Sequence, residues 1–384
     1  MNENHHEDIV EKALRDKAIY CVEGVDGKVL KILDAKLLGS SIRIPKIEKF
    51  IKEISLSSEV LFVSKTDAKN PQRNYLISRP AGKKFLELLN IDMEEIDACF
   101  VNNTLNSYFE VFKKHTNNYY LKSTLSWHQS LHGEDLVKWV EALNTCIESI
   151  RQTVRSKEFS TAIKTRQRGA NKNHKALLDY IDALFANHSR MLVLRIDFGY
   201  KSQALYGKEF QTAVDFPEIK EQHNLLIKHL KTKMFKKKFF GFASKFEYGL
   251  MKGYHFHSLL FLDGSQKRTD VLISKMIGDY WSNTQTKGKG LYYNCNARKE
   301  KYLHLGVGMM NHSDEGLISN LKEHEAPYLN KTDYFIKLIT TGKDRAFIRG
   351  IMPKPKTEKR GRPRSKAMSA LPGAEQAIVS PAAI

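Results

Sequence analysis

Residues 254–264, YHFHSLLFLDG, place two histidines two positions apart in an alternating, mostly apolar run. Such a run is typical of a β-strand, and side chains two apart on a strand point to the same face. His255 and His257 therefore converge. Converging neutral imidazoles are common ligands of a divalent metal ion, although a pair of ordinary core or surface histidines fits the same spacing.

A carboxylate joins the two imidazoles if the preceding strand folds back as a hairpin. Residues 249–253, GLMKG, have a glycine at each end and suit a hairpin turn. This loop pairs Glu247 with His255, and directly opposite residues share a face with Cβ atoms about 4.5–5.5 Å apart. We therefore predict a metal site made of Glu247, His255 and His257.

Two imidazoles and one carboxylate suit a divalent ion that keeps open coordination positions. Zinc fits the ligand types, but no cysteine is near in the sequence. An open site that handles phosphate more often holds magnesium or manganese, so we expect Mg²⁺ or Mn²⁺. Asp197, in RIDFGY on an earlier predicted strand, is expected to fix a ligand histidine, with direct ligation as the alternative.

A candidate nucleophile follows in APYLNKTDYFIKLI, residues 326–339, which is predicted to be a helix that begins near Pro327. Two tyrosines there each precede a lysine by three residues, as in Tyr328 and Lys331, and such residues are neighbours on a helix. The lysine would stabilise a phenolate, which tyrosine needs because its free pKa is about 10. A helical wheel turns Tyr328 toward the apolar face and Tyr334 away from it. We predict Tyr328 as the nucleophile with Lys331 as its partner; the alternative is two ordinary helix tyrosines.

The elements that position these residues are predicted from hydrophobic periodicity. Their order, strand, helix, strand, strand and helix, is typical of an antiparallel sheet. We expect an α+β fold in which the helices pack on one face of that sheet. The strands are expected near residues 190–200, 238–249 and 254–264, and the helices near 175–189, 216–235, 267–282 and 327–340.

The chain is predicted to have three parts. Residues 1–165 are expected to be a separate, mixed or mostly helical region of unknown function, and residues 172–352 to form the domain with the predicted site. The basic, polar stretch RQRGANKN, residues 166–173, is interpreted as a linker between them. Residues 353–384 lack apolar periodicity and are expected to be a disordered basic tail.

Charge favours a nucleic-acid partner. The 384 residues include 62 Lys and Arg against 43 Asp and Glu, a formal net charge of +19, and such an excess favours polyanions. RGRP in the tail resembles an AT-hook core, which binds a narrow A·T minor groove, and a lysine cluster follows the helix near 216–235. A generic basic tail and a solvated helix end are the alternatives. The DNA-binding candidates are Arg360, Gly361, Arg362, Pro363, Lys236 and Lys237.

Other sequence features exclude a membrane protein and a disulfide scaffold. The sequence contains no run of about 18 apolar residues and no signal-peptide core at its charged N-terminus. Its four cysteines are scattered and fit neither a disulfide framework nor a C-x-x-C metal site. We expect reduced thiols, no membrane contact and a cytoplasmic location.

Together these residues resemble the HUH endonucleases, in which a His-hydrophobe-His strand is followed by a tyrosine helix. More closely, residues from about 174 to 365 resemble the filamentous-phage (inovirus) gene-two replication protein family, also seen in bacterial prophages as the YagK/YfjJ C-terminal domain. The resemblance covers about half the chain and does not include residues 1–165. It is carried by SRMLVLRIDFGY, KFEYGLMKGYHFHSLLFLDG, IGDYWSN, GLYYNCN, APYLNKTDYF, GKDRAFIRG and KRGRPRSK.

The resemblance implies a rolling-circle DNA replication initiator in the cytoplasm of a bacterial host. Such proteins nick one strand at an origin, become linked to the 5′ phosphate through tyrosine and leave a 3′ hydroxyl for a polymerase. Tyr328 would be the nucleophile beside the metal group, Lys331 would assist the phenolate or position the metal, and Tyr334 stays open as a second nucleophile. The implied partners are duplex and single-stranded origin DNA, and a host helicase or polymerase.

Two functions from other classes are the alternatives. A non-catalytic prophage regulator of replication or transcription would keep the fold and bind DNA. A metal-dependent hydrolase would use water in place of tyrosine, so that a Tyr328→Phe variant would stay active. The complete set of metal ligands, tyrosine and lysine favours the enzyme that uses tyrosine.

Overall fold

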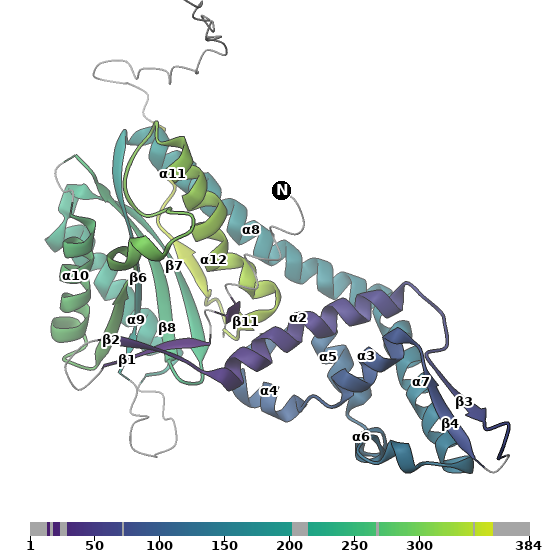
Figure 1. The fold of residues 1–384 in the computed structure, drawn as a ribbon. Helices are drawn as coiled ribbons and strands as arrows, with labels where there is room; N and C mark the ends of the chain where they lie inside the picture. The colour runs from purple at the N-terminus through teal and green to yellow at the C-terminus, as the bar shows by residue number, and fades with distance from the viewer. Residues whose placement is uncertain are drawn as a thin grey trace, which may run out of the picture.

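The protein, seen in a computed structural model, combines a helix-covered sheet with an elongated helical part (Figure 1). The structure describes residues 14–15, 18–23, 29–70, 73–201, 214–265, 269–340 and 342–355. Helices and strands are mixed, and every strand pairing among the described residues is antiparallel. Among the described helices, none combines the length and apolar character needed to cross a membrane.

Six strands form the central sheet. Its order is β10-β6-β8-β7-β12, and β9 pairs with β6 along the same edge as β10. The three strands predicted from the sequence are its centre: β6 spans Arg190–Tyr200, β7 spans Phe239–Gly249 and β8 spans Gly253–Asp263. The shorter strands are β9 (Gly290–Asn294), β10 (Gly308–Asn311) and β12 (Phe347–Arg349).

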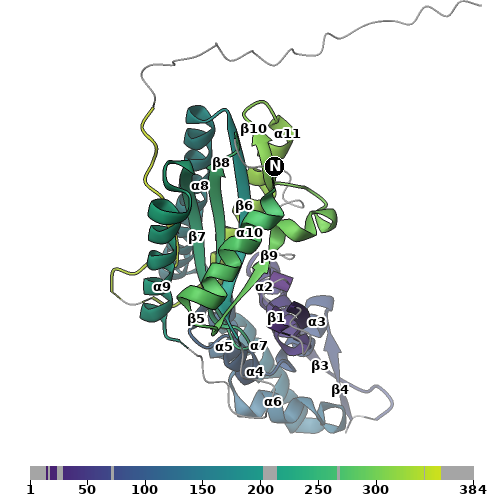
Figure 2. The same cartoon turned by 90° about the vertical axis from the view of Figure 1, so that its left-hand side faces the viewer.

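Helices cover both faces of this sheet, so the prediction of a single covered face is wrong. One face packs its apolar side chains against α9 (Phe216–His229) and α10 (Asp270–Asp279), which lies in front of the sheet in Figure 2. The opposite face packs against α8 (Lys157–Asn187) and α12 (Ala326–Asn330). The segments MLVLRI of β6 and SLLFL of β8 are nearly continuous in apolar residues, which is the pattern of strands buried on both sides.

The helical part has a core of its own, built around three phenylalanines from different helices. The rings of Phe50, Phe85 and Phe112 pack in series, with centroids 5.9 and 6.0 Å apart. The elements are α2 (Ala35–Ser55), β3 (Phe62–Thr66), β4 (Asn74–Ser78), α3 (Pro80–Leu89), α4 (Met93–Cys99), β5 (Asn103–Leu105), α5 (Ser107–Thr116), α6 (Tyr119–Leu125), η1 (His128–Ser130) and α7 (Gly133–Arg155). Before them lies the hairpin of β1 (Ile19–Glu23) and β2 (Val29–Leu33).

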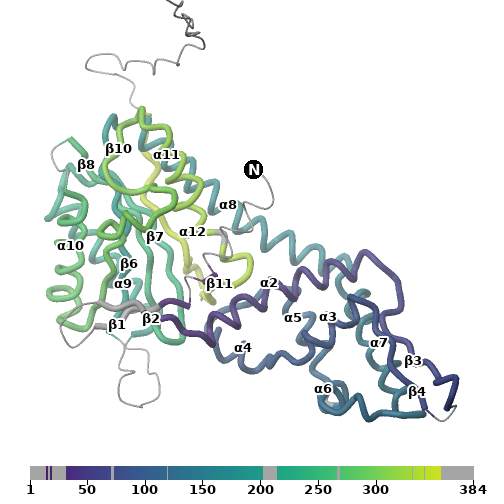
Figure 3. Tube along the Cα trace, viewed as in Figure 1, coloured from purple at the N-terminus to yellow at the C-terminus, as the bar shows by residue number. Residues whose placement is uncertain are grey.

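Residues 166–173 do not form the expected linker, because α8 runs through them without a break. The helix begins after Ser156, whose hydroxyl accepts a hydrogen bond from the Phe159 N–H at 3.1 Å. Phe159 packs in the helical part, whereas Leu177 near the other end packs against the sheet. Figure 3 shows α8 running from one part to the other. The polar residues between them are mostly exposed helix formers with no proline. One 31-residue helix therefore joins both parts.

The predicted helix at 327–340 is also different in the structure. The helix begins earlier, as α11 (Glu315–Asn320) followed by the π-helical turn η7 (Leu321–Glu325), and ends as α12 at Asn330. Pro327 therefore lies inside the helix and follows a turn that loosens the hydrogen-bond ladder, where a proline has no N–H to donate. The chain then forms η8 (Lys331–Tyr334) and β11 (Ile336–Leu338).

Strand β11 joins the C-terminal segment to the helical part. It pairs with β5 through Ile336 opposite Leu105 and Leu338 opposite Asn103. Ile336 and Leu338 are buried and Lys337 is exposed, so period-two burial replaces the helical pattern that we expected. The remaining turns are η3 (Leu230–Met234), η4 (Lys236–Lys238), η5 (Tyr280–Gln285) and η6 (Cys295–Lys301).

Candidate metal centre and active-site cavity

The β7–β8 hairpin brings the three predicted ligands together. Glu247 lies opposite His255, and Gly249 lies opposite Gly253, as the glycine spacing predicted. Gly253 has a φ of 64°, a conformation that favours glycine and closes the turn. The register places the carboxylate and both imidazoles on one face of the sheet, where all three side chains are buried.

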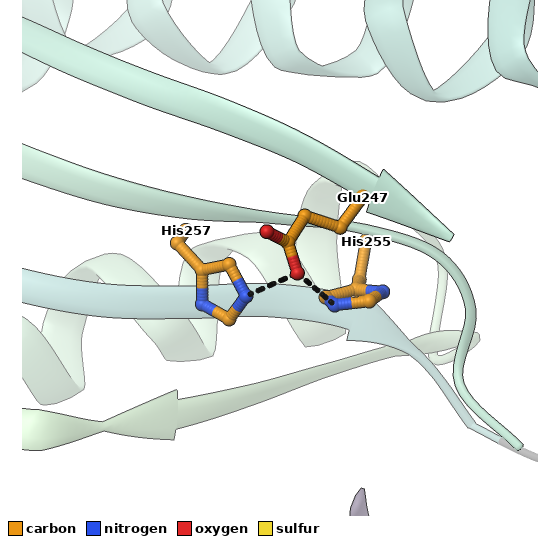
Figure 4. A group of neighbouring side chains, drawn as sticks. All are labelled: Glu247, His255 and His257. Carbon is orange, nitrogen blue, oxygen red and sulfur yellow. Dashed lines mark ion pairs between the residues drawn. The ribbon is translucent and has the colours of Figure 1, made fainter. Parts of the chain in front are cut away.

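The three side chains form a group that could hold a metal ion (Figure 4). Oε2 of Glu247 lies 3.9 Å from Nε2 of His255 and 3.7 Å from Nε2 of His257. One ligand atom from each residue lies within 4.8 Å of the others. These separations leave room for an ion between the three atoms.

Each imidazole is oriented by an acceptor at its other ring nitrogen. Nδ1 of His255 lies 3.0 Å from the Gly253 carbonyl oxygen, and Nδ1 of His257 lies 2.7 Å from Oδ1 of Asp197. Both arrangements favour a proton on Nδ1 and leave Nε2 available, as in metal sites where an outer acceptor fixes the tautomer. Nε2 of His255 is buried and has no hydrogen-bond partner among the described residues. The donor set therefore fits a divalent metal.

The charges around the group act differently on the two histidines. Burial, together with Lys252 and His257, lowers the pKa of His255 well below its usual value. Burial also opposes protonation of His257, but the Asp197 and Glu247 carboxylates outweigh it and raise the pKa of His257. Burial of Asp197 favours its neutral acid form, but the interactions of its carboxylate with His257 and Arg195 outweigh burial and lower its pKa. Asp197 is therefore a carboxylate held against His257.

Asp197 lies where the sequence analysis expected a supporting residue. It is opposite His257 in the β6–β8 ladder and so shares the face of the metal group. It contacts Nδ1 rather than Nε2 of His257, and it is not among the three residues that surround the candidate metal position. The geometry agrees with orientation of a ligand histidine and not with the alternative of direct ligation.

Tyr328 lies against the metal group. Its ring packs edge-on against His257, with centroids 5.4 Å apart. On the tyrosine ring lies the guanidinium of Arg195, whose Cζ is 4.0 Å from the ring centroid. Arg195 in turn pairs with the buried Glu325, with Nη1 and Oε2 2.6 Å apart. The side chain of Lys331, the predicted partner of Tyr328, lies outside the described residues.

The site residues predicted from sequence included neither Arg195 nor Glu325. Arg195 and Asp197 are two apart on β6, which predicts a shared face. Glu325 lies in the π-helical turn η7, one helical turn before Tyr328. That spacing places the two residues on one helix face, so it was a usable signal.

Tyr334 is not brought to the metal group. Its hydroxyl donates a hydrogen bond to Oε1 of Glu48 in the helical part, at 2.9 Å. Burial and the Glu48 carboxylate raise the pKa of Tyr334. Nε of Arg166 donates to its backbone carbonyl oxygen at 2.7 Å. The structure thus gives Tyr334 a contact between the two parts of the chain, in place of a position beside Tyr328.

A cavity of about 330 Å³ opens beside the metal group. His255, His257, Asp197 and Tyr328 line it, together with residues of β9, η6 and the segment that follows η6. The lining is basic, since four cationic side chains face two carboxylates; the cations are Arg195, Lys252, Arg298 and Lys301, and the carboxylates are Asp197 and Glu325. A cavity of this charge suits an anionic substrate such as a phosphodiester.

Two histidines at the cavity were not among the site residues predicted from sequence. His304 and His324 both line it, and their rings stack with centroids 3.9 Å apart and planes 6° apart. They are 20 residues apart in the sequence and lie on different segments. No local spacing could have revealed this contact.

A buried ion pair lies next to the metal group. Lys245 is on β7, two residues before Glu247 and opposite His257, and its side chain is almost completely buried. Its ammonium pairs with the carboxylate of Asp333 in η8. The pair fastens the segment that follows α12 onto the sheet. Lys245 is two residues from Glu247 on the same strand, which predicts that both side chains lie on the same face of the sheet. The pairing with Asp333 could not be predicted from the spacing of residues.

The predicted DNA-binding lysines lie far from the metal group. Lys236 and Lys237 are exposed in η4, just before β7 begins. Glu247 is near the other end of β7, and about ten strand residues span roughly 30 Å. The AT-hook-like residues Arg360, Gly361, Arg362 and Pro363, with the tail from residue 356 onward, lie outside the described residues.

Comparison of the chain with protein-family models, with curated proteins and with solved structures finds no match. The functional assignment therefore depends on the site itself.

Proposed function

We propose that the protein is a metal-dependent DNA endonuclease and strand transferase that uses Tyr328 as its nucleophile. The observation that carries this proposal is the contact between the Tyr328 ring and His257, in a basic cavity that His255 and His257 of the candidate metal group also line. A nucleophile beside a metal position and an anion-binding surface is the combination that phosphodiester cleavage requires. A role in rolling-circle replication would follow from this activity.

Glu247, His255 and His257 would hold the metal ion, for which we propose Mg²⁺ or Mn²⁺. When bound, the ion would supply Lewis-acid stabilisation of charge on the scissile phosphate and on the departing oxygen. The chain's own contribution is to hold the ligand set in place. Asp197 and the Gly253 carbonyl oxygen keep both imidazoles with Nε2 toward the shared position.

Tyr328 would attack the phosphorus atom. Its phenol gives up a proton to water, Oη forms a bond to phosphorus, and the bond from phosphorus to the 3′ oxygen breaks. The 3′ oxygen takes up a proton and becomes a hydroxyl, while the 5′ phosphate stays on the tyrosine. Arg195 stacks on the ring and holds its orientation, and its positive charge favours the phenolate.

The other cavity cations would bind the DNA backbone. Lys252 lies in the hairpin turn, and Arg298 and Lys301 lie in η6; all three line the cavity. Phosphate groups on either side of the scissile bond would thus meet positive charge. This arrangement positions a strand without reading its bases.

The test is nicking of supercoiled circular DNA in the presence of Mn²⁺, followed by denaturing gel electrophoresis. We expect a covalent protein–DNA species that EDTA abolishes and that Tyr328→Phe does not form. Tyr334→Phe is the matched control, because it makes the same chemical change on a tyrosine held by Glu48, and it should still form the adduct. His257→Ala should lose nicking.

The alternatives give different results in this assay. A hydrolase that uses water would nick without an adduct, and Tyr328→Phe would keep that activity. A non-catalytic regulator would bind DNA but would neither nick it nor become linked to it. An adduct formed by Tyr328→Phe would refute the assignment of the nucleophile.

A further inference from the structure

The β3–β4 hairpin presents an open face at the end of the helical part that is remote from the sheet (Figures 1 and 3). Its inner face packs on α7, where the Asn144 side chain donates to the Phe62 carbonyl oxygen at 2.8 Å and accepts from the Phe62 N–H at 3.2 Å. On the outer face, Val63, Tyr75 and Ile77 are 48%, 46% and 40% exposed. Their alternation with better-buried neighbours shows a two-sided ribbon with one side uncovered among the described residues.

The strand register makes these side chains one patch. Val63 lies opposite Ile77, and Lys65 lies opposite Tyr75. All four side chains share the outer face because each is two residues from its neighbour on the same strand. An apolar pair is therefore followed by an aromatic ring beside an ammonium group.

Positive charge surrounds this patch. Lys65, Lys69 and Arg73 are exposed, and none of them forms an ion pair with a described residue. Asp67 is the one acidic residue in the hairpin sequence 62–78. Its carboxylate accepts the Lys69 N–H at 2.9 Å and its own N–H donates to the Arg73 carbonyl oxygen at 2.7 Å. The hydrogen bonds of Asp67 therefore hold the backbone of Lys69 and Arg73 in place.

We propose that this hairpin is a second binding surface for duplex DNA. A two-stranded ribbon fits the width of a DNA groove. Lysine and arginine contact phosphates, and tyrosine donates to the backbone as well. The three exposed cations with a single, structurally engaged carboxylate favour a polyanion over an apolar protein partner. The choice of DNA as that polyanion rests on the proposed function.

The hairpin lies well away from the cavity, because α2 leads from the side of the sheet toward the hairpin and its 21 residues span about 31 Å (Figure 1). The hairpin would therefore contact the duplex outside the cleavage site.

The experiment measures binding of the full chain to a fluorescein-labelled random 30-base-pair duplex, by anisotropy in EDTA over a range of salt concentrations. The variant is Lys65→Gln, Lys69→Gln and Arg73→Gln combined. Each lost phosphate contact lowers the slope of log K against log salt by about 0.9, so the combined variant should lose about 2.7 in slope. We expect the affinity at about 0.15 M salt to fall about 10- to 100-fold.

A matched variant controls for net charge. Lys228→Gln, Lys231→Gln and Lys275→Gln together remove the same charge from exposed lysines of α9, η3 and α10, which lie on the sheet face opposite the metal group. This control should keep the wild-type slope, and thermal melting should show that both variants fold. An equal fall in slope in both variants would overturn the proposal. An unchanged slope in the hairpin variant would also overturn it, and would point to an acidic protein surface as the partner.

The two proposals can fail separately. The hairpin is tested without metal and without cleavage, whereas the proposed activity is tested by the Tyr328 adduct. If the wild type forms the adduct but the hairpin variant binds duplex DNA normally, only the proposal of DNA binding by the hairpin is refuted. If the hairpin variant loses duplex affinity but the wild type forms no adduct, only the proposed nuclease activity is refuted.

Discussion

Replacing Asp197 with asparagine tests whether the metal group depends on its supporting carboxylate. The side chains have nearly the same size and shape, and the asparagine oxygen can still accept a hydrogen bond. The negative charge that lies 2.7 Å from Nδ1 of His257 is removed, however. Since that charge is a main reason for the raised pKa of His257, its loss makes the imidazole a weaker base and a weaker ligand.

The size of the effect follows from the burial of the contact. The His257 side chain is 4% exposed and that of Asp197 is 24% exposed, so water screens their interaction little. Loss of an outer-shell carboxylate of this kind costs about 10- to 100-fold in metal affinity. This range corresponds to about 1.4–2.8 kcal/mol. His257→Ala removes one of the proposed ligands and should lower the metal affinity further.

The assay is a titration of the metal-free protein with Mn²⁺, followed by isothermal calorimetry or by the electron paramagnetic resonance signal of free Mn²⁺. Asp182→Asn is the matched control, because it makes the same change in an exposed pair whose Lys322 Nζ lies 2.9 Å away. That control should bind Mn²⁺ as the wild type does. If Asp197→Asn also binds Mn²⁺ with unchanged affinity, the carboxylate does not support the metal group and the account of His257 is refuted.

Three further predictions concern buried charges. His223 is fully buried and its pKa is lowered to about 4, so it stays neutral in the fold and takes up a proton on unfolding below about pH 6.5. In urea unfolding, the wild type should lose about 2 kcal/mol more stability between pH 7.5 and 5 than His223→Gln does. An equal loss in the two proteins would contradict this. Asp333→Asn leaves Lys245 buried without its partner and should lower the free energy of unfolding by about 3–5 kcal/mol. The double variant Lys245→Met, Asp333→Leu should restore most of this loss. Equal stability of the single and double variants would show that the pair is not coupled. Arg195→Lys keeps the positive charge beside Glu325 but loses the stacking of the planar guanidinium on the Tyr328 ring. Loss of this interaction, worth about 0.5–2 kcal/mol, should slow adduct formation at saturating Mn²⁺ by about 2- to 30-fold, while Mn²⁺ affinity stays the same. A fall in Mn²⁺ affinity instead would assign Arg195 to the metal group.

The metal group was predictable because its geometry is local. Period two on a strand fixes which side chains share a face, and the glycines at 249 and 253 fix the hairpin register. Glu247, His255 and His257 therefore follow from about a dozen consecutive residues. Asp197 was also within reach, since RIDFGY is a recognisable strand, although its pairing with β8 had to be assumed.

Contacts between distant segments were not predictable in this way. The stack of His304 on His324 and the pairing of Lys245 with Asp333 depend on how loops and turns cross the sheet. The segment 166–173 of α8 is polar and lacks an apolar stripe, so it was interpreted as a linker. It contains no proline, however, and its Arg, Gln, Lys and Ala residues favour a helix. The two covered faces of the sheet could have been predicted, because the nearly continuous apolar runs in β6 and β8 already indicated burial on both sides.

The pairing of β5 with β11 has a consequence for any attempt to produce residues 172–352 alone. That fragment would cut α8 in its middle and leave Ile336 and Leu338 on an edge strand with no neighbour. The fragment would also lack Glu48, which accepts the hydrogen bond from Tyr334, and Tyr334 lies only a few residues after the proposed nucleophile. We therefore expect the excised fragment to aggregate or to hold Tyr328 loosely, because contacts with the helical part stabilise the segment that contains Tyr328 and β11.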